Sequence, residues 1–95
     1  MDIVIQRRAN IALHSLENSE QKQILKALER IKITPAKDLF QTLELKLKNL
    51  GQNLYIYRGN YRLRLILSIK NDVCTVEDII ARDKLDMLFA NFKQQ

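Results

Sequence analysis

The sequence is poor in the residues that form cross-links and metal sites. It contains one cysteine, Cys74, and one histidine, His14. A single cysteine excludes an internal disulfide and suits a reducing compartment, and this pair leaves a zinc site short of its usual ligands. Cys74 lies in an apolar strand pattern and is expected to be a small core residue, whereas His14 is expected at the surface. We therefore predict neither a metal nor another cofactor.

Long apolar runs are absent as well. No segment approaches the roughly 20 apolar residues that a membrane-spanning helix needs. The N-terminal segment Met-Asp-Ile-Val-Ile lacks the basic region and long apolar core of a secretory signal. We therefore expect a cytoplasmic protein that does not act at a membrane.

Size and charge fit one small basic domain. A chain of 95 residues can build one core, and 46% hydrophobic residues is typical of a folded protein. We predict a single domain over residues 1–95. The net charge of +5 and the pI of about 9.6 favour polyanionic or acidic partners. A soluble domain with a lysine-rich surface would have the same charge, so that alternative stays open.

The N-terminal third of the chain predicts one strand and two helices. Ile3 and Ile5 alternate with other residues as in a short strand. Apolar residues then recur at helical spacing in two groups, which are Ala9, Leu13 and Leu16, and Ile24, Leu28 and Ile31. Such stripes predict two helices that bury one face each.

The second of these helices carries start and stop signals. Asn18 or Ser19 is expected to cap it, and Gln21 is placed for a capping box with Asn18. Thr34 is expected to end it, because the residue before Pro35 disfavours helical dihedral angles.

Residues 36–50 fit two patterns. Leu43, Leu45 and Leu47 alternate as in a strand, whereas a helix starting near Leu39 also fits. We expect an irregular segment with a short helix followed by an extended stretch.

At the C-terminus, Asp83 is expected to cap a helix. The apolar positions of that helix are Leu85, Leu88, Phe89 and Phe92.

Residues 54–69 predict a hairpin with two different faces. Gly59-Asn60, between two apolar runs, is typical of a two-residue turn. That turn sets Tyr57 opposite Arg62 and Tyr55 opposite Arg64, and directly opposed residues share a face. One predicted face is apolar and covered by the helices: Leu54, Ile56, Leu63, Leu65, Leu67 and Ile69. The other predicted face is exposed: Tyr55, Tyr57, Arg62, Arg64, Ile66 and Ser68.

The predicted exposed face is basic and aromatic. From Lys46 to Lys70 no acidic residue occurs, and the basic residues are Lys46, Lys48, Arg58, Arg62, Arg64 and Lys70. Arginine planes beside tyrosine rings suit phosphate contacts and base stacking on single-stranded RNA. A solvated face with cation–π pairs and a face covered by a partner chain are alternatives that the pattern leaves open.

These elements together predict an α+β domain. We expect a small antiparallel sheet with two N-terminal helices packed on one face, followed by a C-terminal helix. The segment from Arg58 to Leu63 resembles the Gly-x-Tyr-Arg element of the RelE/ParE toxin superfamily. Arg82 follows the next strand as in RelE, and Leu47–Gly51 is similar to the Leu-Lys-Gly segment of that family. The resemblance covers most of the chain.

The resemblance implies a small basic toxin of a type II toxin–antitoxin pair. It implies an acidic antitoxin as partner in a hetero-oligomer, and a sheet with a concave basic face. RelE-like members cut mRNA in the ribosomal A site without a metal, by attack of a 2′-hydroxyl on the adjacent phosphate. Whether this chain is an enzyme stays open.

The resemblance also implies roles for individual residues. Arg62 would hold the scissile phosphate, and Arg82 would stabilise charge in the transition state. Tyr55 and Tyr57 stand where RelE has strand lysines, and are the remaining catalytic candidates, since nearby arginines would favour their ionisation. The expected RNA-binding residues are Lys46, Lys48, Arg58 and Arg64.

Three functions therefore remain as hypotheses. The first is a ribosome-dependent mRNA endonuclease that inhibits translation, which Arg62 and Arg82 support. The second is a ParE-like inhibitor of DNA gyrase, because Leu88 and Phe89 stand where RelE has a C-terminal tyrosine. The third is an inactive family member that only binds an antitoxin.

Overall fold

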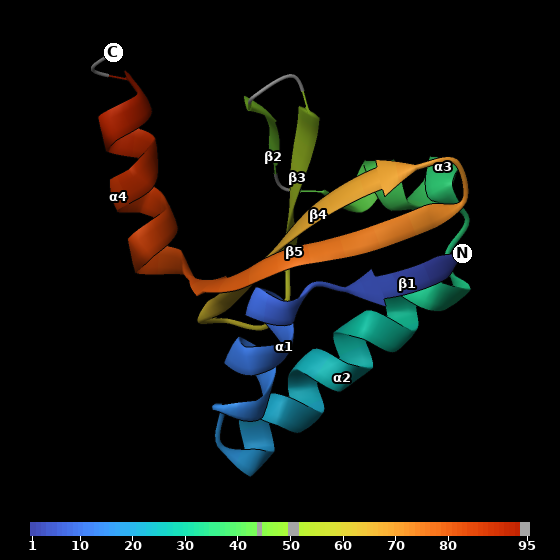
Figure 1. Ribbon diagram of the computed structural model, residues 1–95, viewed down its shortest axis with the longest axis horizontal. Helices are drawn as coiled ribbons and strands as arrows, with labels where there is room; N and C mark the ends of the chain where they lie inside the picture. The colour runs from blue at the N-terminus through green and yellow to red at the C-terminus, as the bar shows by residue number, and fades with distance from the viewer. Residues whose placement is uncertain (44, 50–51, 94–95) are drawn as a thin grey trace.

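The computed structural model describes residues 1–43, 45–49 and 52–93, with side chains described for residues 1–43 and 54–87. Within these ranges the chain forms one five-stranded sheet and several helices (Figure 1). The strands are β1 (Asp2–Ile5), β2 (Leu45–Asn49), β3 (Gln52–Arg58), β4 (Leu63–Lys70) and β5 (Val73–Ala81). The helices are α1 (Arg7–His14), α2 (Asn18–Ile33), α3 (Ala36–Leu39) and α4 (Arg82–Lys93), with a 3-10 turn over Phe40–Thr42.

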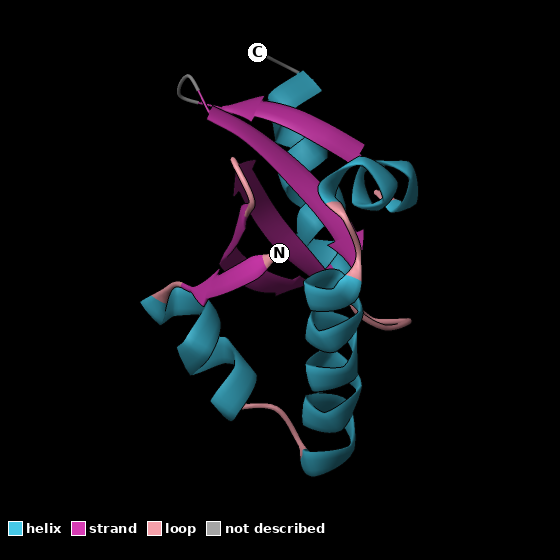
Figure 2. Cartoon of the chain, turned by 90° about the vertical axis from the view of Figure 1, so that its right-hand side faces the viewer, coloured by secondary structure: helices cyan, strands magenta, loops and turns pink. Residues whose placement is uncertain are grey.

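The sheet has the strand order β1-β5-β4-β3-β2. Strand β1 is an edge strand that runs parallel to β5, whereas the other neighbouring pairs are antiparallel. A parallel pair needs a long connection, and α1 and α2 begin that connection. In Figures 1 and 2 these two helices lie together on one side of the strands, and α4 extends away from them. The predicted α+β class is confirmed, with the parallel edge strand as an addition.

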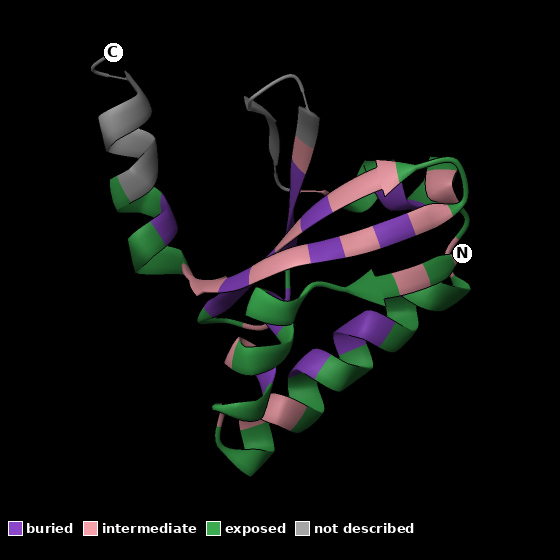
Figure 3. Cartoon of the chain, in the orientation of Figure 1, coloured by how far each residue is buried: buried purple, intermediate pink, exposed green. Residues whose placement is uncertain are grey.

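Helix α2 provides much of the helical side of the core. Its buried positions lie along one side of the helix (Figure 3), and they follow the predicted apolar stripe. The buried residues of the two N-terminal helices are Ala9, Leu13, Ile24, Ala27, Leu28 and Ile31. They pack in one cluster with leucines of β4 and with Val76 and Cys74 of β5.

The predicted capping box of α2 is wrong, although the predicted end is confirmed. The N-cap residue is Glu17, which makes no side-chain cap hydrogen bond. The backbone N–H of Gln21 donates to the Glu17 carbonyl at 2.8 Å, so the helix begins on backbone hydrogen bonds alone. At the other end Thr34 is the C-cap with extended backbone, directly before Pro35.

Within the predicted irregular segment, the described residues 36–43 and 45–49 form a short helix followed by an extended stretch, as predicted. Helix α3 and the 3-10 turn precede β2, and Leu39 is buried.

Helix α4 begins at Arg82, so Asp83 lies in its first turn rather than at the predicted cap position. Leu85 is buried. The side chains of Leu88, Phe89 and Phe92 lie outside the described residues.

The predicted two-residue turn at Gly59-Asn60 is wrong. Strands β3 and β4 pair Tyr57 with Leu65, and Arg58 with Arg64, so the pairing register is shifted by three residues from the predicted one. The Asn60 Oδ1 accepts hydrogen bonds from the backbone N–H of Arg62 at 2.9 Å and of Leu63 at 2.7 Å. Asn60 therefore organises a wider loop over residues 59–62, which we call the β3–β4 loop. Among the described non-glycine residues, only Asn71, in the turn before β5, has a positive φ.

The longer loop exchanges the two faces of β3. Tyr55 and Tyr57 share a face with Leu67 and Leu65, and both tyrosines belong to the core cluster with 9% exposure each. The predicted exposed face of tyrosines and arginines is therefore wrong. An odd shift in register moves every side chain of a strand to the other face, which explains why one misjudged turn has this effect. The leucines of β4 are buried as predicted.

Gly59 is needed for close packing rather than for an unusual backbone angle. A Cβ atom at this position would lie 2.6 Å from Ile24 Cδ1 and 3.3 Å from the Leu63 carbonyl oxygen. We expect Gly59→Ala to lower the free energy of unfolding by about 1–3 kcal/mol, because it overfills a packed site. Urea denaturation measures this. Ile24→Val removes the blocking methyl group, so the double variant should recover part of the loss, and strictly additive effects would contradict the proposed clash.

Candidate functional site

Four arginines lie at the edge of the sheet where β3 and β5 end and β4 begins. Arg58 and Arg64 lie directly opposite each other on adjacent strands, on the face that carries Ile56 and not the core tyrosines. Arg82 follows β5, and its backbone N–H donates to the Arg62 carbonyl at 2.8 Å. We call Arg58, Arg62, Arg64 and Arg82 the arginine cluster. Like charges placed directly opposite each other are unfavourable, so such a cluster is typical of a site that binds an anion.

Arg64 is buried, with 4% exposure. Its Nη1 donates to the carbonyl oxygens of Asn60 at 2.7 Å and Leu63 at 3.1 Å. These hydrogen bonds compensate for the burial of the guanidinium charge and stabilise the conformation of the β3–β4 loop. Arg64, predicted to bind RNA, therefore supplies positive potential and holds the loop.

Arg62 is held by helix α2. Its Nε donates to Glu20 Oε2 at 3.0 Å, and its Nη2 donates to Glu20 Oε1. Asn60 Nδ2 also donates to Glu20 Oε2 at 3.2 Å and to Gln23 Oε1 at 2.8 Å. The hydrogen bond from Arg62 lowers the pKa of Glu20, and Glu20 in turn raises the pKa of Arg62. The residue predicted to bind the scissile phosphate thus already has a carboxylate partner.

The Glu20–Arg62 pair predicts a specific pH dependence of stability. Because the pKa of folded Glu20 lies below its ordinary value of 4.5, the pair contributes fully above that pH. The contribution is lost as the pH falls through the lowered pKa. The difference in urea midpoint between the wild type and Glu20→Gln should therefore shrink between about pH 6 and about pH 3. Glu29→Gln is the matched control, since Glu29 lies on the same helix, is exposed and makes no ion pair within the described residues. A constant difference between the wild type and Glu20→Gln would contradict the expectation.

The other two arginines of the cluster, Arg58 and Arg82, are exposed to solvent. Within the described part of the chain neither side chain makes an ion pair. Their guanidinium groups are available to a bound phosphate. The resemblance implied site roles for Arg62 and Arg82, and the backbones of these two residues are hydrogen-bonded to each other. The arginines of the cluster that are exposed and make no ion pair within the described residues are Arg58 and Arg82.

The remaining predicted site residues lie elsewhere or outside the described side chains. Tyr55 and Tyr57 face the core, and the ring of Tyr55 makes an edge contact with Phe40 at a centroid distance of 5.2 Å. A buried tyrosine cannot reach a substrate on the other face. Lys46 and Lys48 lie on β2, opposite Tyr55 and Asn53, and their side chains are not among those described.

One exposed aromatic residue was not predicted. Tyr61 lies in the β3–β4 loop beside Arg62, and it is 69% exposed. The Asn60 side chain, which can close a turn on the following backbone N–H groups, is the sequence signal that favours a longer loop and an outward Tyr61.

The described residues offer few potential metal ligands and one thiol. They contain no group of three histidine, cysteine, aspartate or glutamate side chains that could hold a metal ion. Cys74 is buried, and burial raises the pKa of its thiol to about 11. His14 is exposed, and its Nδ1 lies 3.1 Å from the Asn10 carbonyl oxygen. No helix in the described ranges is long and apolar enough to span a membrane.

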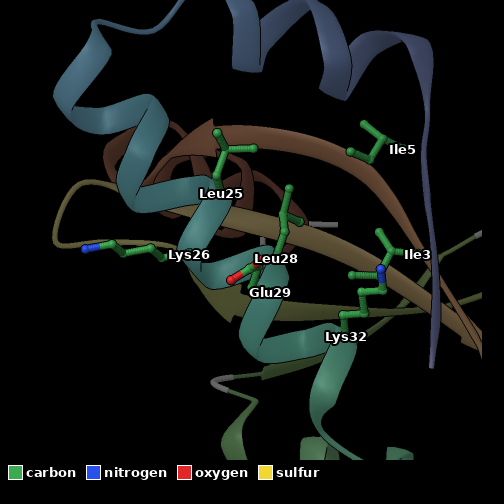
Figure 4. A pocket seen from close by; sticks show the side chains of 7 residues that line it. All are labelled: Ile3, Ile5, Leu25, Lys26, Leu28, Glu29 and Lys32. Atoms are coloured by element: carbon green, nitrogen blue, oxygen red, sulfur yellow. The ribbon is translucent and has the colours of Figure 1, made fainter.

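A groove of about 510 Å³ lies between the edge strand β1 and helix α2 (Figure 4). Its lining residues are Ile3, Ile5, Leu25, Lys26, Leu28, Glu29 and Lys32. The apolar side chains form most of the lining, and two lysines against one glutamate give it a net positive charge. Such a groove suits an apolar segment that carries acidic residues.

Comparison with known proteins defines the class of fold. No family model matches the sequence, and no curated protein matches it. Among solved structures, a chain of the archaeal RelE-RelB complex from Pyrococcus horikoshii OT3 superposes with a TM-score of 0.66. It shares 20% sequence identity, over 85% of this chain and 93% of that chain. The predicted resemblance to the RelE/ParE superfamily is thus confirmed for the fold: this chain has a RelE-like fold.

Proposed function

We propose that this protein is the toxin of a type II toxin–antitoxin pair and inhibits translation by cleaving mRNA on the ribosome. The observation that carries this proposal is the arginine cluster on a RelE-like fold. Arginine side chains are well suited to phosphate oxygens, because their planar guanidinium groups donate several hydrogen bonds. A polyanion in an extended conformation is the ligand class that fits four arginines at one end of a sheet.

In this proposal the arginines act mainly by electrostatic stabilisation. The 2′-hydroxyl of one nucleotide gives its proton to water and its oxygen attacks the adjacent phosphorus, which forms a 2′,3′-cyclic phosphate. The bond from phosphorus to the 5′-oxygen of the next nucleotide breaks, and that oxygen takes a proton from water. Arg58 and Arg82 contact the phosphate oxygens, where charge develops in the transition state. Arg82 also begins helix α4, whose N-terminus carries a partial positive charge. Arg62 and Arg64 hold the loop in place through Glu20 and the loop carbonyls.

An acidic antitoxin is the proposed protein partner. The similar archaeal chain was solved in a RelE-RelB complex, and the groove between β1 and α2 has the apolar lining and positive charge that an acidic segment would complement. Leu25→Asp, at a half-exposed position of the groove, should weaken the complex with the antitoxin. Ile33→Asp, at a more exposed position outside the groove, is the control.

The test of the function is induction of the protein followed by mapping of mRNA 5′ ends. New 5′ ends within translated messages, together with arrest of growth, are expected. The Arg58→Ala and Arg82→Ala double variant should relieve both effects. Intact messages with continued translation would refute the proposal.

A second candidate function is inhibition of DNA gyrase. The burial of Tyr55 and Tyr57 favours it, because it removes the two acid–base candidates that the sequence placed on the exposed face. A supercoiling assay with the purified protein decides between the two. Inhibition of supercoiling with intact mRNA would support gyrase as the target.

A further inference from the structure

The β3–β4 loop holds all of its residues in place except the side chain of Tyr61. Gly59 is buried against Ile24 of α2. Asn60 accepts two backbone hydrogen bonds within the loop and donates two to α2. Arg62 is fixed by Glu20. The loop is held at several points and therefore presents the exposed ring of Tyr61 from a fixed backbone.

Tyr61 makes no contribution to the core. It is 69% exposed, whereas Tyr55 and Tyr57 are 9% exposed. Within the described residues its ring makes no aromatic contact and its hydroxyl makes no hydrogen bond. An isolated exposed tyrosine is ordinary on a protein surface, but this one lies next to Arg62, whose backbone carbonyl is bonded to Arg82. The loop that carries Tyr61 lies beside the junction of β5 and α4 (Figure 1), where the backbones of Arg62 and Arg82 are hydrogen-bonded.

We propose that Tyr61 stacks on an unpaired base of a single-stranded RNA whose phosphates lie on Arg58 and Arg82. A tyrosine ring on a fixed backbone loses little conformational freedom when it binds, and stacking accepts any of the four bases. The duplex forms of DNA and RNA do not fit, because their bases are already stacked on each other. The RNA in this proposal rests on the proposed function, but the stacking contact does not depend on cleavage.

A cycle of protein and RNA variants tests the stacking directly. The ligands are an unlabelled single-stranded RNA heptamer of mixed sequence and the same heptamer with abasic riboses, which keeps every phosphate. Stacking on one base is typically worth about tenfold in affinity. The wild type should therefore bind the abasic heptamer about tenfold more weakly than the intact one, and Tyr61→Leu should bind both with equal, weak affinity. Tyr61→Phe, which keeps the ring, should behave as the wild type.

Tyrosine fluorescence gives a second readout, since the chain has no tryptophan. Intact RNA should quench the emission of the wild type, and the quenching should vanish in Tyr61→Phe, because the two remaining tyrosines are buried. Ile33→Ala, which trims an exposed side chain far from the loop in sequence, should quench as the wild type does.

The outcomes separate this inference from the proposed function. Equal losses for Tyr61→Leu on intact and abasic RNA would overturn the stacking contact, and so would an absence of quenching in the wild type. Stacking that depends on Tyr61, in a protein that leaves mRNA and translation intact, would uphold the inference and refute the proposed function.

Discussion

Replacing Tyr57 with alanine is expected to lower the free energy of unfolding by about 3–5 kcal/mol, the range for truncating a large aromatic side chain in a core. Tyr57 belongs to the core cluster and lies opposite Leu65 on the buried face of the sheet. For a small domain with a total stability of about 5–15 kcal/mol, this loss removes a large fraction of that stability. Urea denaturation followed by circular dichroism measures the effect.

Tyr61→Ala is the matched control for this prediction. The same chemical change at the exposed position should alter stability by less than about 0.5 kcal/mol. Tyr57→Phe keeps the ring and should cost far less than Tyr57→Ala. The register that a two-residue turn would impose exposes Tyr57, so a mild effect of Tyr57→Ala would favour that register and contradict the structure.

The two tyrosines of β3 show where sequence patterns stop being informative. A tyrosine has an apolar ring and a polar tip, so alternation with Leu54 and Ile56 fits either face. The leucines of β4 are easier to assign, because Leu63, Leu65 and Leu67 share one face and the opposite face carries the polar residues Arg64 and Ser68 beside Ile66. The predicted burial of the β4 leucines was therefore correct, although Arg64, predicted to be exposed, is buried. The prediction for β3 depended on the length of the turn.

The length of that turn depends on contacts that are distant in the sequence. Asn60 closes the loop with its own side chain, which local turn chemistry allows. Its other bonds reach Glu20 and Gln23, and the Cβ-free Gly59 packs on Ile24. Spacing within the hairpin does not reveal that helix α2 lies beneath it, so the wider loop could not be derived from the hairpin alone.

The candidate site also depends both on strand pairing, which the sequence predicts, and on a contact with a distant helix, which it does not. Arg62 and Arg82 flank two paired strands, so antiparallel pairing brings their backbones together, as the resemblance implied. The partner of Arg62 is Glu20, on a helix far away in the chain. Sequence patterns within the hairpin could not reveal this ion pair, and they placed Tyr55 and Tyr57 on the exposed face although the exposed tyrosine is Tyr61.

Replacing Arg82 with alanine is expected to slow mRNA cleavage on programmed ribosomes by about 10²–10³-fold, the cost of removing one donor to a developing negative charge. The fold should survive, because the exposed side chain is removed while the backbone N–H still donates to the Arg62 carbonyl. Single-turnover primer extension gives the rate constant, and its dependence on protein concentration gives the apparent affinity.

Lys84→Ala removes a positive charge from the same turn of α4 and is the control for a general loss of charge, because Lys84 is exposed and lies outside the arginine cluster. It should weaken binding slightly and leave the rate constant at saturation unchanged. If Arg82 only binds RNA, the Arg82→Ala variant would lose affinity and keep the wild-type rate at saturation. A fall in the saturated rate, confined to Arg82→Ala, identifies Arg82 as a residue that acts on the transition state, because Lys84→Ala controls for the loss of one positive charge.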